Sequence, residues 1–278
     1  MIHFTEISKL QSFLKSEWKK GKTIGLVPTM GALHEGHLSL IKASKEDNDI
    51  TVCTIFVNPT QFNNLADLAK YPRTVDKDCE MLLNNHCDVV FTPTVEEMYR
   101  SATELKISFG DLENVMEGAF RPGHFNGVGI VVAKFFNIIQ PDNAYFGQKD
   151  LQQCAVIKRL VNDLSFQINI NICPTRREND GLAMSSRNKN LTVDERLKAP
   201  IIFQILTEAK TMVDTHSLAS IKNWVIDRFE KESTLKLEYF EIVQLASLQT
   251  SSKYLPNETA FCVAVFLGNT RLIDNIII

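Results

Sequence analysis

Two histidines stand three residues apart in the stretch PTMGALHEGH, just after the apolar run TIGLV, which is typical of a buried strand. His34 and His37 would share one face at the start of a helix predicted over 37–47, where each ring could direct an N–H group at the same anion. A helix N-terminus adds unbonded backbone N–H groups and a positive dipole end, and Gly36 leaves room for a flat base or ribose. The pattern predicts a polyphosphate site.

On the residues alone, two other interpretations of this histidine pair stay open. Histidines at this spacing are often ordinary surface or core residues of an amphipathic helix, and they could also bind zinc. Zinc fits less well, because H-E-G-H lacks the i, i+4 spacing of H-E-x-x-H and no third ligand follows at a familiar spacing.

A second cluster, FGQKDLQQ, follows another predicted strand, residues 143–146. Gly147 would allow a tight exit from that strand. Lys149 and Asp150 would begin a helix predicted over 150–163. Lys149 could neutralise phosphate charge that grows during a reaction, while Asp150 could bind a ribose hydroxyl or cap the helix. Taken alone, such a pair is more often a solvated helix start.

The polar stretch GLAMSSRN, residues 181–188, offers two hydroxyl groups and a guanidinium in a turn without regular periodicity. Ser185, Ser186 and Arg187 could form an anion cradle with backbone N–H groups, since arginine can bind phosphate through two parallel hydrogen bonds. The alternative is a polar linker that leads into a helix capped by Thr192.

Uncharged amide side chains follow two of the predicted elements. Asn58 and Gln61 come just after a strand predicted over 51–57, and Gln153 lies one helical turn beyond the start of the helix over 150–163. Amides in such places could bind a small polar substrate through hydrogen bonds.

The elements that carry these residues alternate between strand and helix along the first two thirds of the chain. Buried strands are predicted over residues 23–28, 51–57, 88–91, 143–146 and 167–173, and helices over 37–47, 74–85, 127–139 and 150–163. Such alternation predicts a parallel sheet with helices on its faces. Ligands bind a parallel sheet outside the carboxyl ends of its strands, and the clusters above follow such ends.

The pattern changes beyond the polar stretch. A capping box that begins at Thr192 opens a helix predicted over 193–212, and a second helix is predicted over 217–232. Three strands follow in LEYFEIVQ, TAFCVAVFLG and TRLIDNIII, with a hairpin at LGNTR. We predict an α/β fold with two domains, residues 1–175 and a smaller α+β domain of residues 176–278.

Composition narrows the class of protein. The chain has 278 residues, 44% of them hydrophobic and 23% charged, which suits a globular protein with a real core. A net charge of −3 argues against a nucleic-acid partner, because nucleic-acid-binding domains usually carry a basic excess. The N-terminus lacks a cleavable apolar segment and no apolar run reaches membrane-spanning length, so we expect a cytoplasmic protein without a membrane partner. Six cysteines without a C-x-x-C pair predict reduced core thiols.

Taken together, the motifs resemble those of the pantoate–β-alanine ligase family. PTMGALHEGH, FVNPTQF, RPGHFNGV, FGQKDLQQ and GLAMSSRN occur in the order and spacing of that family, and the resemblance spans nearly the whole chain. It implies membership of the nucleotidyltransferase superfamily, with an H-x-G-H signature and with MSSRN as the counterpart of the KMSKS loop. It further implies a Rossmann-like N-terminal domain, a smaller C-terminal lid domain, a homodimer, and the use of ATP and Mg²⁺.

Carried onto this chain, the resemblance implies roles for particular residues. The ATP site would comprise Met30, Gly31, Ala32, Leu33, His34, Glu35, Gly36, His37, Gly147, Gln148, Lys149, Asp150, Arg176, Met184, Ser185, Ser186 and Arg187. Catalysis would rest on His34, His37, Lys149, Ser185, Ser186 and Arg187. Gln61 and Gln153 would hold pantoate, with Gln61 near β-alanine as well. Arg176 stands where relatives often have valine and use only the main chain, and the Mg²⁺ ligands stay unassigned because Lys77 stands among the acidic residues of YPRTVDKD.

The implied reaction joins pantoate to β-alanine through a pantoyl adenylate, with release of pyrophosphate and AMP. Two other functions stay open. A nucleotidyltransferase would add a nucleotide to a small acceptor and stop there, but the amides Gln61 and Gln153 replace the cationic acceptor pocket that such an enzyme would need. A nucleotide-binding module without activity fits poorly with intact histidine, lysine, serine and arginine clusters.

Overall fold

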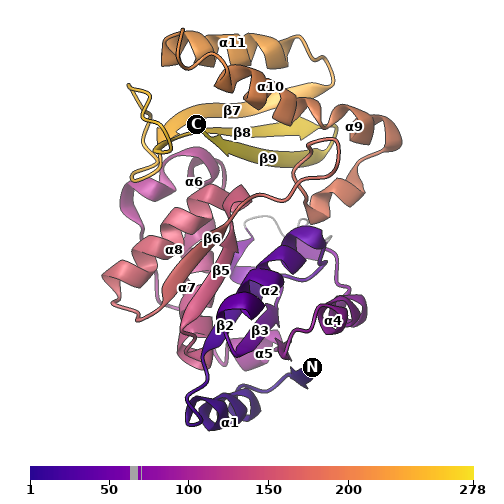
Figure 1. Ribbon diagram of the computed structural model, residues 1–278, viewed down its shortest axis with the longest axis vertical. Coiled ribbons are helices and arrows are strands. Elements are labelled where there is room, and N and C mark those ends of the chain that lie inside the picture. Colours follow the sequence, from indigo (N-terminus) through magenta and orange to yellow (C-terminus); the bar gives the residue numbers. More distant parts are fainter. Residues whose placement is uncertain (63–67, 70) are drawn as a thin grey trace. The chain divides into compact units, whose positions relative to one another are not determined.

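The computed structural model describes residues 1–62, 68–69 and 71–278. The chain divides into two compact units (Figure 1). Unit 1 comprises Met1–Gly147 and Val156–Cys173, and unit 2 comprises Gln148–Ala155 and Pro174–Ile278. The predicted pair of domains, with its boundary after residue 175, stays a prediction.

Within the described residues, unit 1 is built on a six-stranded parallel sheet in the order β1-β4-β3-β2-β5-β6. The strands are β1 (Ile2–Phe4), β2 (Ile24–Thr29), β3 (Ile50–Ile55), β4 (Val89–Phe91), β5 (Asn143–Gly147) and β6 (Asn169–Cys173). All six residues of β3 are buried, as expected for a parallel strand with both faces covered. The five strands predicted for this sheet are therefore confirmed.

The strand order locates the point at which this sheet binds ligands. After β2, the chain builds outward through β3 and β4 on one side and then returns to add β5 and β6 on the other. In open parallel sheets the ligand crevice lies outside the carboxyl ends of the two strands where this reversal occurs. In unit 1 these strands are β2 and β5, which lead into residues 30–37 and 147–150.

The helices associated with this sheet connect its strands. They are α1 (Ile7–Trp18), α2 (Glu35–Asp47), α4 (Val75–Asn84), α5 (Val95–Met98), α6 (Met116–Phe120), α7 (His124–Ile139) and α8 (Leu151–Asp163), and the 3-10 turns are η1 (Pro59–Gln61), η2 (Gly110–Glu113) and η3 (Gln148–Asp150). α2 lies against β2, β3 and β5, while α7 packs against β2, α1 and η1 (Figure 1). α7 is buried along most of its length, which explains its nearly continuous apolar sequence.

A close approach and a buried polar network hold α2 on the sheet. A Cβ at Gly25 of β2 would lie 2.2 Å from the Ser44 hydroxyl oxygen, so only glycine lets the helix come this near. At the same C-terminal end of α2, the Asn48 amide donates to the Tyr145 hydroxyl, which donates to Asp47, both at 2.8 Å. Burial raises the pKa of Tyr145, so this hydroxyl keeps its proton and its donor role.

Unit 2 combines helices with an antiparallel sheet, as predicted. Its described residues form a three-stranded sheet in the order β7 (Leu235–Gln244), β8 (Thr259–Leu267), β9 (Thr270–Ile277), with a hairpin between β8 and β9. The apolar faces of α10 (Ile201–Lys210) and α11 (Leu218–Glu230) contribute to one core with these strands. α9 (Val193–Lys198) and η4 (Ser186–Asn190) precede them in the chain.

Several elements differ from the sequence-based expectations, and the short helices α5 and α6 were not predicted. The single helix predicted over 193–212 is wrong, because the chain forms α9 and α10 with a break at Pro200, which has no N–H group to continue the hydrogen-bond ladder. The capping box at its start is confirmed, since Thr192 and Glu195 exchange side chain to backbone hydrogen bonds. β1 and α1 were not predicted, because β1 has only three residues and no side chain caps α1.

The cysteines and the apolar segments complete this description. Cys53, Cys87, Cys154 and Cys262 are buried, and burial raises the pKa of the Cys87 thiol to about 12, so it stays protonated at neutral pH. In the described ranges, no helix has the length and apolar character needed to cross a membrane.

Candidate active site

The two histidines after β2 cap the helix that follows them. The backbone N–H of Gly36 donates to His34 Nδ1 at 3.2 Å, and the backbone N–H of His34 donates to His37 Nδ1 at 3.3 Å. The pair thus forms a capping box, with ring centroids 4.1 Å apart. α2 consequently begins at Glu35, two residues before the predicted start.

These hydrogen bonds determine where each neutral ring carries its proton. An imidazole whose Nδ1 accepts a hydrogen bond carries its hydrogen on Nε2. His34 and His37 are therefore both Nε2–H donors at the N-terminus of α2, where the helix dipole also favours an anion. In its neutral form, each ring is thus held in the tautomer that carries its hydrogen on Nε2, which can donate to an anion.

A buried carboxylate shapes the turn between β2 and these histidines. Asp78 of α4 is only 1% exposed, and its two oxygens accept hydrogen bonds from the backbone N–H groups of Ala32 at 2.9 Å and Leu33 at 2.8 Å. The Thr74 hydroxyl donates to the same carboxylate. Gly31 and Ala32 have φ values of 80° and 50°, so the turn is left-handed at two consecutive positions. Sequence reasoning missed Asp78, although it noted the acidic run in which this residue lies.

The amide residues after β3 form a second network. Gln61 is buried, and its amide nitrogen lies 2.7 Å from the Met30 sulfur, so the structure brings together residues that follow two neighbouring strands. Asn58 Nδ2 donates to Gln61 Oε1 at 3.2 Å and to the Gly127 carbonyl at 3.1 Å. The Tyr99 hydroxyl donates to Asn58 Oδ1 at 2.7 Å. Asn58 and Met30 thereby orient the Gln61 side chain.

The RPGHFNGV motif supports this amide network from α7. His124 Nδ1 lies 2.9 Å from the backbone oxygen of Gln61. A Cβ at Gly127 would lie 2.3 Å from the Thr60 carbonyl oxygen, so glycine is needed for α7 to approach η1 this closely. His124 and Gly127 are thus positioned to fix the backbone of the predicted pantoate-binding segment.

The FGQKD cluster contributes residues to unit 2. The Lys149 ammonium lies 3.4 Å from Asp150 Oδ1, and the Lys149 side chain is 16% exposed. Gln153 is half-buried in the first turn of α8. The backbone of Gly147 is not left-handed and a Cβ there would meet no described atom within 4 Å, so its role in a tight exit from the strand stays a prediction.

The MSSRN segment is an ordered turn in unit 2. The backbone N–H of Met184 donates to the Arg176 carbonyl at 3.0 Å, so the structure pairs two of the predicted nucleotide-binding residues. Ser185 caps η4, because its hydroxyl oxygen accepts from the Arg187 backbone N–H at 3.2 Å. Ser186 is the first residue of η4.

The predicted site residues are divided between the two units. Unit 1 holds residues 30–37, Gln61 and Gly147, and unit 2 holds residues 148–150, Gln153, Arg176 and residues 184–187. Within each unit the structure places them as described above. The convergence of the two groups on one ligand stays a prediction.

The described residues contain no group of three or more His, Cys, Asp or Glu side chains that could hold a metal ion. Asp78 commits both oxygens to backbone N–H groups, and Asp150 is 48% exposed beside Lys149. These side chains do not form a ready Mg²⁺ site, and we assign no ligand to the ion.

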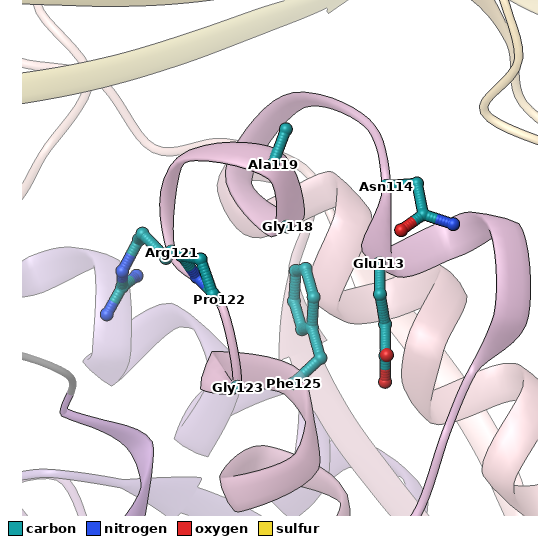
Figure 2. A pocket seen from close by; sticks show the side chains of 8 residues that line it. All are labelled: Glu113, Asn114, Gly118, Ala119, Arg121, Pro122, Gly123 and Phe125. Atoms are coloured by element: carbon teal, nitrogen blue, oxygen red, sulfur yellow. The ribbon is translucent and has the colours of Figure 1, made fainter.

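A cavity of about 310 Å³ lies elsewhere in unit 1, between Glu113 and Phe125 in the chain. Figure 2 shows the Phe125 ring pointing toward Gly118 from the helix below. The lining of this cavity includes none of the predicted site residues, but it includes Arg121, Pro122 and Gly123 of the RPGHFNGV motif.

The sheet order defines an open parallel α/β protein, a class that binds ligands outside the carboxyl ends of its strands. Within that class, the chain belongs to the pantoate-beta-alanine ligase family, whose model matches residues 2–277.

Individual relatives agree with this assignment. The chain is 48% identical to a pantothenate synthetase of Bacteroides thetaiotaomicron, covering 97% of this chain and 96% of that one. It is 49% identical to a pantothenate synthetase of Flavobacterium psychrophilum, with 99% of both chains covered. Among solved structures, pantothenate synthetase from Thermus thermophilus superimposes with a TM-score of 0.93 at 37% identity over 99% of both chains. A pantoate-beta-alanine ligase from Francisella tularensis, complexed with beta-gamma ATP and beta-alanine, has a TM-score of 0.83 at 38% identity, covering 100% of this chain and 97% of that one.

Proposed function

We propose that this chain is a ligase that condenses pantoate with β-alanine at the expense of ATP, releasing AMP and pyrophosphate. Membership of the family over residues 2–277 supports this activity, as does the Francisella tularensis relative crystallised with beta-gamma ATP and beta-alanine. The observation that carries the proposal is the capping pair His34 and His37. Their Nδ1 atoms accept backbone hydrogen bonds, so the neutral rings carry Nε2–H donors at a helix N-terminus that follows the carboxyl end of β2.

The first step makes the carboxylate reactive. A carboxylate is a poor acceptor for an amine, so a carboxylate oxygen of pantoate attacks the α-phosphorus of ATP, the bond to the β-phosphate oxygen breaks, and pyrophosphate leaves. The products are pantoyl adenylate and pyrophosphate. His34, His37 and Lys149 would donate hydrogen bonds to the phosphate oxygens on which charge grows, and donors fixed in advance stabilise such charge most effectively.

The second step forms the amide bond. The amine of β-alanine attacks the acyl carbon of the adenylate, loses a proton, and expels AMP, which keeps the bridging oxygen from pantoate. These two reaction steps require no covalent enzyme intermediate, so positioning and charge stabilisation supply the catalysis. Gln61 and Gln153 would hold pantoate, and Gln61 would also lie near β-alanine.

The remaining predicted residues would complete the nucleotide site. Arg176 and Met184 are joined through their backbones, which suits recognition of adenine by main-chain groups. Ser185, Ser186 and Arg187 would bind the phosphates. We further propose that ATP arrives with Mg²⁺, which commonly binds such sites through substrate phosphates and water. The homodimer and the cytoplasmic location stay predictions.

Product analysis tests the proposed function. The purified chain should convert ATP to AMP and pyrophosphate only when pantoate and β-alanine are both present, with one pantothenate formed per AMP. Without β-alanine, pantoate should support exchange of labelled pyrophosphate into ATP. A nucleotide-linked product without AMP release would instead indicate a nucleotidyltransferase, and the absence of turnover would indicate a binding module.

A further inference from the structure

Two consecutive polar residues are buried in β9, an edge strand of the sheet in unit 2. Asp274 and Asn275 of β9 are 4% and 3% exposed, although neighbouring positions of this strand are apolar. Buried polar side chains persist in such places only when hydrogen-bonded. Because consecutive strand residues point to opposite sides of the sheet, a single strand can bind two different segments through them.

Asn275 binds the segment that carries Lys149. Its Nδ2 donates to the carbonyl oxygens of Gln148 at 3.0 Å and Lys149 at 2.9 Å, and its Oδ1 accepts from the Gln148 side chain at 3.2 Å. A primary amide offers two donors and an acceptor in one neutral group, and this contact uses all three functions. The backbone from which the Lys149 side chain projects is thereby fixed.

Asp274 binds the segment that leads to Ser185 and Arg187. Its oxygens accept from both terminal nitrogens of Arg177, at 2.6 and 2.9 Å, in a bidentate pair. The same guanidinium donates to the Gly181 carbonyl at 3.1 Å and stacks on the Phe203 ring at 3.6 Å. The Arg177 guanidinium is thus fixed by a carboxylate, a carbonyl oxygen and an aromatic ring.

The held arginine in turn fixes the start of the MSSRN segment. Arg177 forms a backbone bridge with Ala183, and Met184 donates to the Arg176 carbonyl, so residues 176–184 close into a short hairpin. Gly181 turns this hairpin with a φ of 93°, a conformation that favours glycine. The Asp274–Arg177 ion pair therefore fixes the position of the backbone from which residues 184–187 continue.

Electrostatics agree with this arrangement. Burial raises the pKa of the Asp274 carboxyl, while the Arg177 guanidinium and the Lys149 ammonium oppose this rise. The carboxylate therefore depends chiefly on Arg177, and removing one partner of a buried pair is costly.

We propose that Asp274 and Asn275 are positioning residues that hold the Lys149 segment and the MSSRN segment on one strand, in the arrangement that ATP requires. The inference rests on the proposed function, since it assumes that both segments bind the nucleotide. It assigns to β9, a strand outside every recognised motif, the task of joining two of them. Neither residue needs to touch the substrate, because each acts through the segment that it holds.

The test compares two conservative variants with a control on the same strand. Asn275→Asp keeps the shape of the side chain and removes both donors, and Asp274→Asn keeps the shape and removes the charge. Arg271→Met serves as the control, because Arg271 also lies on β9 and forms a partly buried ion pair, with Glu238 of β7. For each protein, the melting temperature, kcat and the three KM values are measured, together with pyrophosphate exchange.

We expect Asn275→Asp and Asp274→Asn to slow pyrophosphate exchange by about 10²-fold, the effect of displacing a catalytic group by roughly 1 Å, and to raise the KM of ATP. The KM of β-alanine should stay within about twofold, a free-energy change of only a few tenths of a kcal/mol, because neither segment is predicted to bind it. Arg271→Met should lower the melting temperature while leaving kcat and all KM values unchanged.

Several results would overturn the inference. Normal exchange and a normal ATP KM in both conservative variants would show that the segments hold their place without β9. Equal kinetic losses in Arg271→Met, or failure of both variants to fold, would assign these residues to general stability. An inactive wild-type protein would contradict the proposed function itself, whereas an active wild type with unaffected variants would contradict only the role of β9.

Discussion

At the scale of single residues, the histidine pair combines two tasks that are usually separate. His34 and His37 use Nδ1 to satisfy backbone donors of α2, and this leaves Nε2 as the hydrogen-bearing nitrogen on each ring. Serine, threonine and aspartate would cap the helix but could not present a neutral N–H donor. The identity of the cap residue is therefore tied to the chemistry proposed for the site.

Replacing His34 with asparagine should separate these two tasks. Asparagine is among the best N-cap residues, so the free energy of unfolding should change by less than about 1 kcal/mol. The shorter asparagine side chain cannot place an N–H donor where Nε2 lies, so pyrophosphate exchange should nevertheless slow by about 10²- to 10³-fold. The measurement pairs the exchange assay with thermal unfolding, and His34→Ala, which loses the cap as well, should be the less stable protein. Near-normal exchange in His34→Asn would mean that the ring does not serve the phosphates.

Gln61 offers a second test at this scale. Its side chain is oriented by Asn58 and Met30, and it is predicted to hold pantoate. Gln61→Ala should raise the KM of pantoate by about tenfold or more, which corresponds to the roughly 1.5 kcal/mol of one hydrogen bond. The KM of ATP should hardly change. Steady-state kinetics with each substrate varied in turn check this, with Gln153→Ala as the companion variant. Equal weakening of ATP and pantoate would point to a general disturbance of the site.

At the scale of elements, the turn between β2 and α2 depends on α4. Ala32 adopts a left-handed conformation, which costs of order 1–3 kcal/mol for a residue with a side chain. Asp78 offsets this cost by accepting from the N–H groups of Ala32 and Leu33. A helix distant in sequence thereby sets the angle at which the capping histidines are presented.

Asp78→Asn should loosen that turn. An amide has only one oxygen, so one of the two buried N–H groups loses its acceptor and the protein should lose about 1–3 kcal/mol of stability. Pyrophosphate exchange should fall as well, while Thr74→Val, which removes only a donor to the carboxylate, should have the smaller effect. Chemical denaturation and the exchange assay measure the two effects. Unchanged exchange in a destabilised Asp78→Asn protein would show that the turn does not govern the site.

The elements that could be predicted from the sequence are those with strong local signals. β2, β3 and β5 are continuous apolar runs, and α2 and α8 follow them at the expected spacing, so their bounds lie within two residues of the predicted ones. The meeting of Met30 with Gln61 also follows from the rule for parallel strands. The break at Pro200 was within reach of sequence reasoning, because proline ends the helical hydrogen-bond ladder.

The contacts that could not be predicted join segments distant in sequence. Asp78 resembles any acidic residue near the start of a helix until the fold brings the β2–α2 turn to it. Asp274 and Asn275 interrupt an apolar strand, which signals a buried polar contact, but the pattern does not identify the partners. The capping role of His34 was missed for a related reason, since histidine is not among the usual cap residues.

At the scale of the whole molecule, the predicted ATP-binding residues are divided between the two units. His34 and His37 lie in unit 1, whereas Lys149 and Arg187 lie in unit 2. If one nucleotide contacts all of them, its binding must couple the two units. Coupling of that kind would exclude water from the pantoyl adenylate, a mixed anhydride, and so protect it from hydrolysis.

Amide hydrogen exchange can detect this coupling. Exchange across residues 180–190 should be faster in the free protein and slow down on addition of ATP and Mg²⁺, because the phosphates would bind the residues that carry this turn. Residues 261–277, in the sheet of unit 2, should show a smaller change. Arg187→Ala should lose the added protection along with most of the adenylation. Exchange that is already slow without ligand, or that ATP leaves unaltered, would mean that the site is preformed.

The most direct test of the proposed reaction follows one oxygen atom. Pantoate labelled with ¹⁸O in its carboxylate is incubated with the protein, ATP, Mg²⁺ and β-alanine, and the products are analysed by mass spectrometry. Attack of the carboxylate on the α-phosphorus, followed by cleavage of the acyl carbon–oxygen bond, predicts one labelled oxygen in each AMP, one in each pantothenate and none in pyrophosphate. Label in pyrophosphate or inorganic phosphate, or AMP without label, would contradict the adenylate and with it the role assigned to the site.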